Sequence, residues 1–298
     1  MKILVTGAAG FIGFHLTKHL AESRPYSTIV AIDNFKPSYE PRIKEDRAIV
    51  LLKMGVNLLY GDVCDEVFIR YLFETHEFSH VIHLAGETGV RRSVQQPQDF
   101  ANSNIGCFVQ LLELIVPYKV HIVYASSSTV YGPDSSLPFD PTSAHGSASN
   151  MYALSKMVDE VIFRWVMQYF KCHLIIRCMQ MFADAYCRES NTTILGLRFF
   201  TVYGPWGRPD MAVYKYAHNL ATGKKIHMAI HDSDKPAVRD FTYIDDIISG
   251  ITMAMAYHPD ECGEIFNLGY SEPHSLEELL QILKVEMGIK EGYVVSLL

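Results

Sequence analysis

The residues that decide the fold stand at the start of the chain, Lys2-Ile3-Leu4-Val5-Thr6 followed by Gly7-Ala8-Ala9-Gly10-Phe11-Ile12-Gly13. The first five form a short apolar run typical of a buried strand, and the pattern G-x-x-G-x-x-G follows it directly. Such glycines allow a tight turn, a close approach of the backbone to a pyrophosphate, and close packing of the helix that begins there. The N-terminus of that helix attracts negative charge. The stretch predicts a dinucleotide-binding loop, with a plain tight turn as the alternative.

An acidic residue further along the chain favours one cofactor. Asp33 ends the second predicted strand, 20 positions after Gly13, where a carboxylate can accept hydrogen bonds from the adenosine ribose hydroxyls. The same carboxylate would repel a 2′-phosphate, so the sequence predicts NAD rather than NADP. The nearby cations Arg42, Lys44 and Arg47 leave NADP open as an alternative.

Short β-branched runs alternate with longer segments of helical periodicity through the first two thirds of the chain. Runs that are apolar on both faces and separated by helices indicate a parallel sheet covered on both sides. We therefore expect an α/β fold with a doubly wound, Rossmann-type parallel sheet. The predicted strands are Lys2–Thr6, Thr28–Asp33, Asn57–Tyr60, His80–Ala85, Val120–Ser126 and Thr193–Phe199, and the predicted long helices are Asp99–Ile115, Tyr152–Phe170, Asp210–Ala221 and Tyr243–Tyr257.

The chain is expected to divide near residue 203. Residues 1–203 carry the strand and helix alternation, with an unusual insertion near 171–193, and residues 204–298 form a smaller, looser domain. In that second part, Thr242 followed by Asp245 predicts a capping box at the start of a helix, so Asp245 and Asp246 are expected to be structural.

Composition and charge exclude several classes of protein. The 298 residues carry a net charge of −7 with a pI near 6.0, which gives no basic surface for nucleic acid or an anionic membrane. The apolar runs are too short for a membrane span, and no targeting segment precedes Lys2, so a cytoplasmic location is expected. The cysteines are scattered without a C-x-x-C pair, which favours free thiols over disulfides or a metal site. They are Cys64, Cys107, Cys172, Cys178, Cys187 and Cys262.

A second constellation points to catalysis. Tyr152 and Lys156 stand four residues apart and therefore share one face of a predicted helix. A lysine beside a tyrosine stabilises the phenolate, so that its oxygen can act as a base near neutral pH. The run Ser126-Ser127-Ser128-Thr129 ends a predicted strand 25 residues before Tyr152, where a hydroxyl can hydrogen-bond a reacting oxygen. By itself each pattern also fits a surface helix or a capped loop.

Together these motifs resemble the extended short-chain dehydrogenase/reductase superfamily, whose Ser or Thr, Tyr and Lys are matched by Ser127, Tyr152 and Lys156. A more specific resemblance is to the UDP-glucuronate 4-epimerases. It rests on the stretch from Leu197 to Ala212 (LRFFTVYGPWGRPDMA), on His83 to Arg91 (HLAGETGVR) and on Arg239 to Asp246 (RDFTYIDD).

The resemblance implies a reaction. NAD would take hydride from carbon 4 of UDP-glucuronate while Tyr152 removes the proton of the 4-hydroxyl, and return of hydride to the other face would give UDP-galacturonate through a 4-keto intermediate. The intermediate is a β-keto acid and prone to lose carbon dioxide. We expect substrate-binding residues Ser128, Thr129, Thr201 and Arg208 to restrain the sugar carboxylate, and Arg239 to bind the diphosphate.

Further residues complete the predicted cofactor site. Asp62, after the third strand, could hold the adenine amine, with a plain turn and helix cap as the alternative. The whole predicted set is Gly7, Gly10, Phe11, Ile12, Gly13, Asp33, Asn34, Asp62, Val63, Leu84, Ala85, Gly86, Ser103, Tyr152 and Lys156.

The sequence departs from the family pattern in two places, namely the longer segment between Lys156 and Arg198 and a shortened C-terminal end. Two rival hypotheses therefore stay open. One is a related decarboxylase or dehydratase, although a dehydratase usually carries acidic residues where Ser128 and Thr129 stand. The other is a catalytically impaired NAD-binding relative. The resemblance also implies a homodimer that pairs the helices predicted at Asp99–Ile115 and Tyr152–Phe170.

Overall fold

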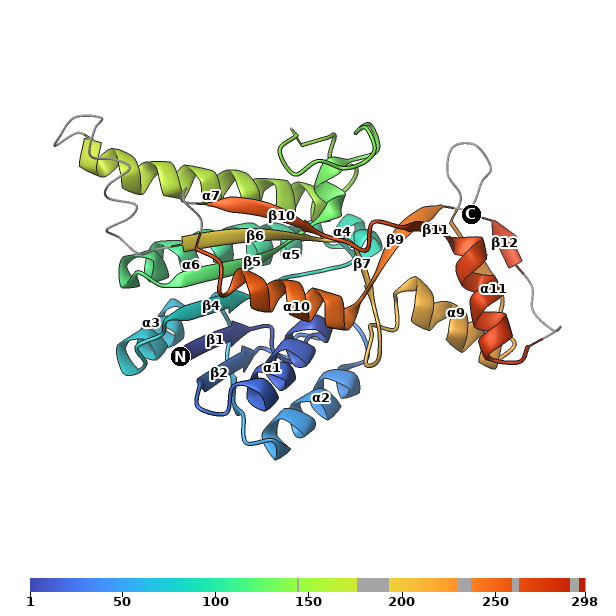
Figure 1. The fold of residues 1–298 in the computed structure, drawn as a ribbon, viewed down its shortest axis with the longest axis horizontal. Helices are drawn as coiled ribbons and strands as arrows, with labels where there is room; N and C mark the ends of the chain where they lie inside the picture. The colour runs from blue at the N-terminus through green and yellow to red at the C-terminus, as the bar shows by residue number, and fades with distance from the viewer. Residues whose placement is uncertain (144, 176–192, 230–236, 259–262, 290–294, 298) are drawn as a thin grey trace. The chain divides into compact units, whose positions relative to one another are not determined.

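A computed structural model describes residues 1–143, 145–175, 193–229, 237–258, 263–289 and 295–297 (Figure 1). The chain forms two compact units. The first comprises Met1–Phe199 and Ile248–Asn267, and the second comprises Phe200–Ile247 and Leu268–Leu298. The chain therefore leaves the first unit, returns to it, and leaves again. Most of the insertion expected near 171–193 lies outside the described residues.

The first unit is built on a seven-stranded sheet with the order β10-β6-β5-β4-β1-β2-β3. The registers from β6 to β3 are all parallel. Ile3, Leu4 and Val5 of the central strand are completely buried, which explains why the strands read as continuous apolar runs rather than alternating ones. The doubly wound sheet expected from the sequence is confirmed. Its strands are β1 (Lys2–Thr6), β2 (Thr28–Asp33), β3 (Asn57–Tyr60), β4 (His80–His83), β5 (His121–Ser127), β6 (Thr193–Phe199) and β10 (Glu264–Leu268).

Helices flank this sheet (Figure 1). Helix α1 contacts α2, α3 contacts α6, and α6 contacts α7. The long helix predicted at Asp99–Ile115 forms instead as three consecutive segments, of which the middle one, Ala101–Gly106, is a π-helix. The helices of this unit are α1 (Phe11–Ser23), α2 (Pro41–Lys53), α3 (Glu66–Thr75), α4 (Val90–Gln95), α5 (Pro97–Phe100), α6 (Cys107–Ile115) and α7 (Met151–Ile175), together with short 3-10 turns at Val116–Tyr118 and Ser128–Tyr131.

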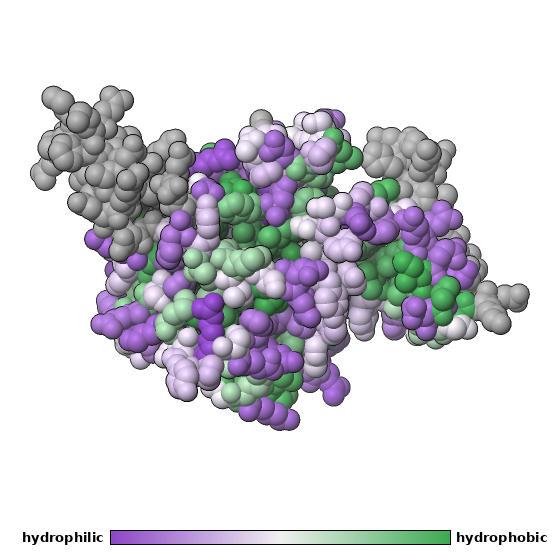
Figure 2. All heavy atoms as spheres, in the orientation of Figure 1, coloured by the Kyte–Doolittle hydropathy of each residue, from purple (hydrophilic) through white to green (hydrophobic). Residues whose placement is uncertain are grey.

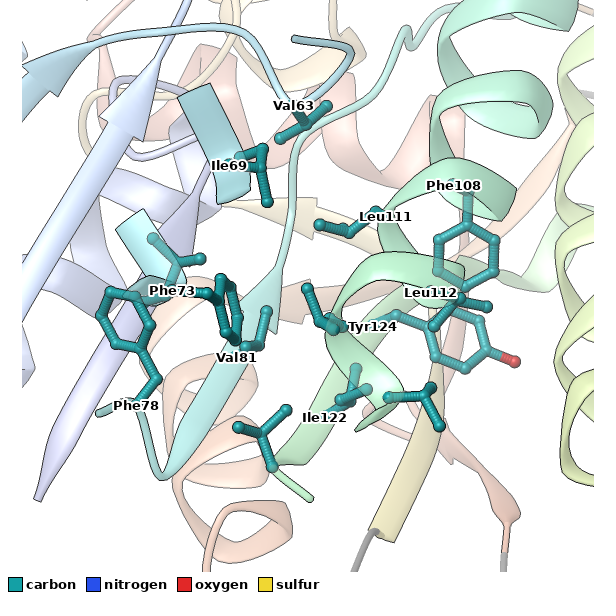
Figure 3. Packing of buried hydrophobic residues seen from close by; sticks show 14 of the residues in the cluster. Val63, Ile69, Phe73, Phe78, Val81, Phe108, Leu111, Leu112, Ile122 and Tyr124 are labelled. Carbon is teal, nitrogen blue, oxygen red and sulfur yellow. The ribbon is translucent and has the colours of Figure 1, made fainter. Parts of the chain in front are cut away.

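The main core of the first unit lies between the sheet and the helices α3 and α6 (Figure 3). Phe108, Leu111 and Leu112 of α6 face Val81 of β4 and Tyr124 of β5 in this cluster. Three to four apolar residues per two helical turns give such a face. Burying each large side chain stabilises the fold by roughly 1.5–3 kcal/mol, so this layer holds the helices firmly against the sheet.

One described helical segment, Pro97–Tyr118, is long and apolar enough to cross a membrane. Several of its apolar side chains belong to the core just described, since Phe108, Leu111, Leu112 and Ile115 are each at most 1% exposed. Burial against the sheet thus accounts for these apolar residues of the segment. On the face shown in Figure 2, hydrophilic and hydrophobic residues are intermixed.

The cysteine prediction is wrong at one pair. Cys64, in the loop after β3, and Cys107, the first residue of α6, form a disulfide with Cα atoms 4.8 Å apart. Gln110 of α6 also donates a hydrogen bond to the Cys64 carbonyl at 3.3 Å. Their separation of 43 residues carries no local sequence signal, because the pair meets only when α6 packs beside the β3 loop.

Replacing Cys64 by Ser is expected to lower the free energy of unfolding by about 4 kcal/mol, because the cross-link restricts a 43-residue loop of the unfolded chain. Urea unfolding of the oxidised parent and variant measures the difference. With reductant present the two proteins should unfold together. Mass spectrometry of the alkylated, unreduced protein provides the direct check, and free thiols at both positions would contradict the assignment.

The second unit contains a three-stranded sheet in the order β11-β9-β7 and a two-stranded pair of β12 with β8. A small apolar cluster around Tyr216, Leu220, Ile226 and Leu280 lies between its helices and these strands. Its elements are β7 (Thr201–Tyr203), α9 (Ala212–Ala221), β8 (Ile226–Met228), β9 (Val238–Tyr243), β11 (Pro273–Ser275), α11 (Leu276–Glu286) and β12 (Val295–Leu297), and α10 (Ile244–Ala254) starts here and ends in the first unit.

The predicted capping box at Thr242 is not formed. The Thr242 hydroxyl donates to the Asp240 carboxylate at 2.9 Å, and Thr242 belongs to β9, because α10 begins only at Ile244. Asp245 and Asp246 lie in the first turn of α10, where carboxylates interact favourably with the helix dipole. A capping box does open α11, between Ser275 and Glu278.

Candidate functional site

The glycine loop joins β1 to α1 at the carboxyl end of the sheet. Gly7 has a φ of +71°, and a Cβ at this position would lie 2.7 Å from the Ala85 amide nitrogen. A Cβ on Gly13 would lie 2.1 Å from the Gly7 carbonyl oxygen. Both positions therefore require glycine for steric reasons. Gly10 is the N-cap of α1 and has no side chain to satisfy the first helical N–H groups, at Phe11, Ile12 and Gly13, which leaves them available to an anion.

Asp33, the last residue of β2, binds the glycine loop through its side chain. Its carboxylate accepts hydrogen bonds from the Ala9 N–H at 3.0 Å and from the Phe35 N–H at 2.8 Å, and it is 4% exposed. Lys44 of α2 also pairs with it at 3.1 Å. Asp33 is thus a structural anchor of the loop as well as a candidate ribose partner. The cation beside it weakens the argument that its charge would reject a 2′-phosphate.

The remaining predicted cofactor residues of strands β2 to β4 lie along the same edge. The Asn34 amide donates to the Asp62 carboxylate at 2.9 Å, so these two side chains meet across neighbouring strand ends. Val63 packs in the main core, which gives it a structural role. The N–H of Ala85, after β4, donates to the Thr6 hydroxyl at 3.2 Å, and this bond holds the Leu84-Ala85-Gly86 segment next to the glycine loop.

The catalytic candidates Tyr152 and Lys156 lie in the first two turns of α7. The side-chain oxygen of Asn150 accepts the Ala153 N–H at 2.9 Å, which fixes the start of the helix. The helix packs against β5 and the 3-10 turn Ser128–Tyr131. Tyr152 and Lys156 thus belong to the helix that packs against the strand carrying Ser127, and the ring of Tyr152 packs edge-on against Phe100.

Charges around Lys156 favour its protonated form. Burial alone would lower the pKa of the Lys156 ammonium, but its interactions with Asp159 and Tyr152 outweigh burial, and the pKa is raised above its usual 10.5. His83, at the end of β4, is buried close by. Burial, and to a smaller extent the charge of Lys156, lowers the pKa of the His83 imidazole to about 3, so His83 is neutral and hydrogen-bonded to Thr6.

The four hydroxyl side chains from Ser126 to Thr129, at the end of β5, have different roles. Ser126 donates to Glu160 and is structural. Ser127 caps the following 3-10 turn, because its Oγ accepts the Thr129 N–H at 3.3 Å, and its own proton stays available as a donor. Ser128 is half-buried, and the Thr129 Oγ1 is buried without a hydrogen-bond partner among the described residues. Buried hydroxyls in native proteins normally have a partner, so Thr129 is a candidate ligand contact.

Two buried groups near the site were missed by sequence reasoning. The first is Asn104 of the π-helix, which donates from its amide to the Glu87 carbonyl at 3.0 Å and to the Ser155 hydroxyl at 2.9 Å, and accepts from the Glu87 N–H at 2.7 Å. It therefore connects the loop after β4 to α7. The available signal was an asparagine in the middle of a predicted apolar helix, where a buried amide must find hydrogen-bond partners.

The second missed group is the ion pair of Glu160 and Arg198, both completely buried, which joins α7 to β6. Arg198 donates two hydrogen bonds to Glu160, at 2.9 and 2.7 Å, and His145 and Ser126 bind the same carboxylate. Burial would raise the pKa of Glu160, but the bonds from Arg198, His145 and Ser126 outweigh it and hold the pKa at about 2. The pair fixes α7 to the sheet.

The predicted residues Thr201, Arg208 and Arg239 lie in the second unit. Thr201 is half-buried at the start of β7. Arg208 binds the carboxylate of Asp210 with two hydrogen bonds, at 3.0 and 2.6 Å, which is the fork geometry by which arginine recognises carboxylates. Arg239 of β9 is exposed and donates to the Val238 carbonyl at 2.7 Å. Ser103, in the first unit, is half-buried in the π-helix that contacts α7.

Comparisons with known proteins place these features in context. The model of the NAD dependent epimerase/dehydratase family matches residues 3–269. UDP-glucuronate 4-epimerase 4 of Arabidopsis thaliana is 35% identical over 303 residues, which cover 97% of this chain and 64% of that relative. The chain thus spans less than two thirds of that relative's length. The crystal structure of UDP-glucuronic acid 4-epimerase from Bacillus cereus with UDP-glucuronic acid and NAD is 29% identical, with a TM-score of 0.81, and covers 100% of this chain and 86% of that one.

Proposed function

Because this chain belongs to the NAD dependent epimerase/dehydratase family, we propose that it binds NAD and inverts carbon 4 of UDP-glucuronate to give UDP-galacturonate. The observation that supports the proposal is the packing of α7, whose first two turns carry Tyr152 and Lys156, against β5 and the turn that follows Ser127. The similarity to UDP-glucuronate 4-epimerases over 97% of the chain supports the choice of substrate.

The residues of the first unit fit NAD. The glycine loop leaves no room for a Cβ at Gly7 or Gly13, and the uncapped N-terminus of α1 suits a pyrophosphate. Asp33 and the Asn34–Asp62 pair would bind the adenosine end, and Tyr152 and Lys156 the nicotinamide end. Bound NAD would supply a hydride acceptor that returns the same hydride, so the reaction has no net redox change.

The chain's own residues would then handle the proton. The Lys156 ammonium stabilises the Tyr152 phenolate, which accepts the proton of the sugar 4-hydroxyl. Tyr152 returns this proton after the 4-keto sugar has rotated in the site. Ser127 donates a hydrogen bond to the oxygen at carbon 4. Ser128, Thr129, Thr201 and Arg208 are assigned to the sugar carboxylate, whose restraint would oppose loss of carbon dioxide from the 4-keto intermediate.

The test is to incubate the purified chain with UDP-glucuronate and NAD and to follow the anomeric signals by proton NMR. New UDP-galacturonate without accumulation of NADH is the expected result. UDP-glucose is the matched control substrate, because it lacks the carboxylate. A pentose product would establish a decarboxylase, loss of water a dehydratase, and retained NAD with unchanged sugar an impaired relative, and each would overturn the proposal.

Partners and location are part of the same proposal. We expect a homodimer that binds a UDP-sugar and no nucleic acid, and mass photometry measures the oligomeric state. The cytoplasmic location stays a prediction. The Cys64–Cys107 disulfide bears against it, because thiols of cytosolic proteins are normally kept reduced.

A further inference from the structure

The catalytic lysine has a partner of its own on α7. Lys156 Nζ donates to the Asp159 carboxylate at 2.9 Å, and the two side chains are only 9% and 2% exposed. Tyr152, Lys156 and Asp159 stand at positions i, i+4 and i+7, which place them along one face of the helix. Among the described residues, the ammonium is hydrogen-bonded to Asp159 and not to Tyr152.

The other titratable groups around the pair are either neutral or paired with an opposite charge. Glu160, next to Asp159 on α7, is neutralised by Arg198 of β6. His83 of β4 faces Lys156 and is neutral. Tyr124 of β5 faces Asp159, and burial and the neighbouring carboxylates raise its pKa well above 10, so it is neutral as well. Asp159 is therefore the principal counter-charge of Lys156.

The hydrogen bonding of Asp159 is incomplete. Its Oδ1 is buried without a hydrogen-bond partner among the described residues. A purely structural carboxylate at this depth would be expected to use both oxygens, as the neighbouring Glu160 does with Arg198, His145 and Ser126. Burial raises the pKa of the Asp159 carboxyl to about 6, and the hydrogen bond from the Lys156 ammonium opposes this shift and favours the charged carboxylate.

We propose that Asp159 is a positioning residue that competes with the Tyr152 phenolate for the Lys156 ammonium and so limits how much phenolate forms. A lysine ammonium has three N–H donors, and the bond to Asp159 draws it along the helix toward position i+3. Release of that bond would let the ammonium approach Tyr152 more closely. The role rests on the proposed function, in which Tyr152 is the base.

The test measures phenolate directly and needs no sugar. The full chain with NAD is titrated with base, and the near-ultraviolet phenolate absorbance of Tyr152→Phe is subtracted to isolate Tyr152. Asp159→Asn is expected to move the midpoint to lower pH, giving about tenfold more Tyr152 phenolate below the midpoint. Asp159→Glu keeps the charge and should stay close to the parent. Asp159→Ser is a second variant without the charge, should Asp159→Asn fail to fold.

A double variant separates positioning from simple charge repulsion. In a Lys156→Met background, Asp159→Asn should move the midpoint clearly less than it does in the parent, because no ammonium remains to be released. An equal shift in both backgrounds would show that Asp159 acts on Tyr152 directly, and would overturn the proposal. So would an unchanged or higher midpoint. Because no sugar is present, these outcomes are independent of whether the chain proves to be a 4-epimerase.

Discussion

Tyr152→Phe is expected to lower kcat for conversion of UDP-glucuronate by about a thousandfold, because it removes the oxygen that, in the proposed mechanism, accepts the proton of the sugar 4-hydroxyl. The aromatic ring and its contact with Phe100 are retained, so the loss should fall on chemistry rather than on folding. Conversion is followed by the anomeric NMR signals, and NAD affinity is measured separately by fluorescence.

Tyr26→Phe is the matched control, because Tyr26 is fully exposed and the substitution removes the same atom. It should leave both kcat and NAD affinity unchanged. Substantial turnover by Tyr152→Phe would mean that another group takes the proton, and the assignment of Tyr152 as the base would then be wrong.

The features that could be predicted from the sequence are those encoded locally. Five of the six predicted strands begin at the residue where the observed strand begins, because an apolar run bounded by turn residues specifies a buried parallel strand wherever it occurs. The glycine loop is also encoded locally, since Gly7 has a positive φ and a Cβ on Gly13 would meet the Gly7 carbonyl within the same β1-α1 turn. Tyr152 and Lys156 were visible as a pair because helical spacing alone places them together.

What could not be predicted depends on contacts between distant segments. Glu160 and Arg198 are 38 residues apart, and the Cys64–Cys107 bond spans 43. The sequence around each of these four residues does not indicate which residue it pairs with. Asp159 was not predicted from the sequence either, because its burial against Lys156 depends on how α7 packs in the fold. Helix periodicity likewise does not indicate the π-helix at Ala101–Gly106, which contains Asn104, a residue whose partners Glu87 and Ser155 lie elsewhere in the chain.

In the second unit, sequence similarity identified Thr201, Arg208 and Arg239, but the carboxylate bound by Arg208 is its neighbour Asp210. A substrate carboxylate would have to displace it. The local sequence Arg208-Pro209-Asp210 contains both partners, so competition between Asp210 and a substrate carboxylate for Arg208 could be predicted from the sequence. The exposure of Arg239 could not be predicted in this way.

Glu160→Gln is expected to lower the free energy of unfolding by about 3–5 kcal/mol, because it leaves the buried Arg198 guanidinium without its carboxylate. Urea unfolding at pH 7 measures the loss. Glu66→Gln is the matched control on α3, since the Glu66–Arg70 pair is half-exposed and its removal should barely change stability. A loss for Glu160→Gln no larger than that for Glu66→Gln would contradict the structural role given to the buried pair.

The buried Glu160–Arg198 pair also predicts how the free energy of unfolding depends on pH. The Glu160 carboxylate has its pKa depressed from 4.5 to about 2, so its stabilising contribution is complete above about pH 4.5 and disappears as the pH falls toward 2. The stability difference between the parent and Glu160→Gln should therefore shrink over that range, because the parent takes up the proton that the amide never carried. A difference that stays constant down to the acid transition would mean that packing of the side chain, rather than its charge, holds α7 to β6.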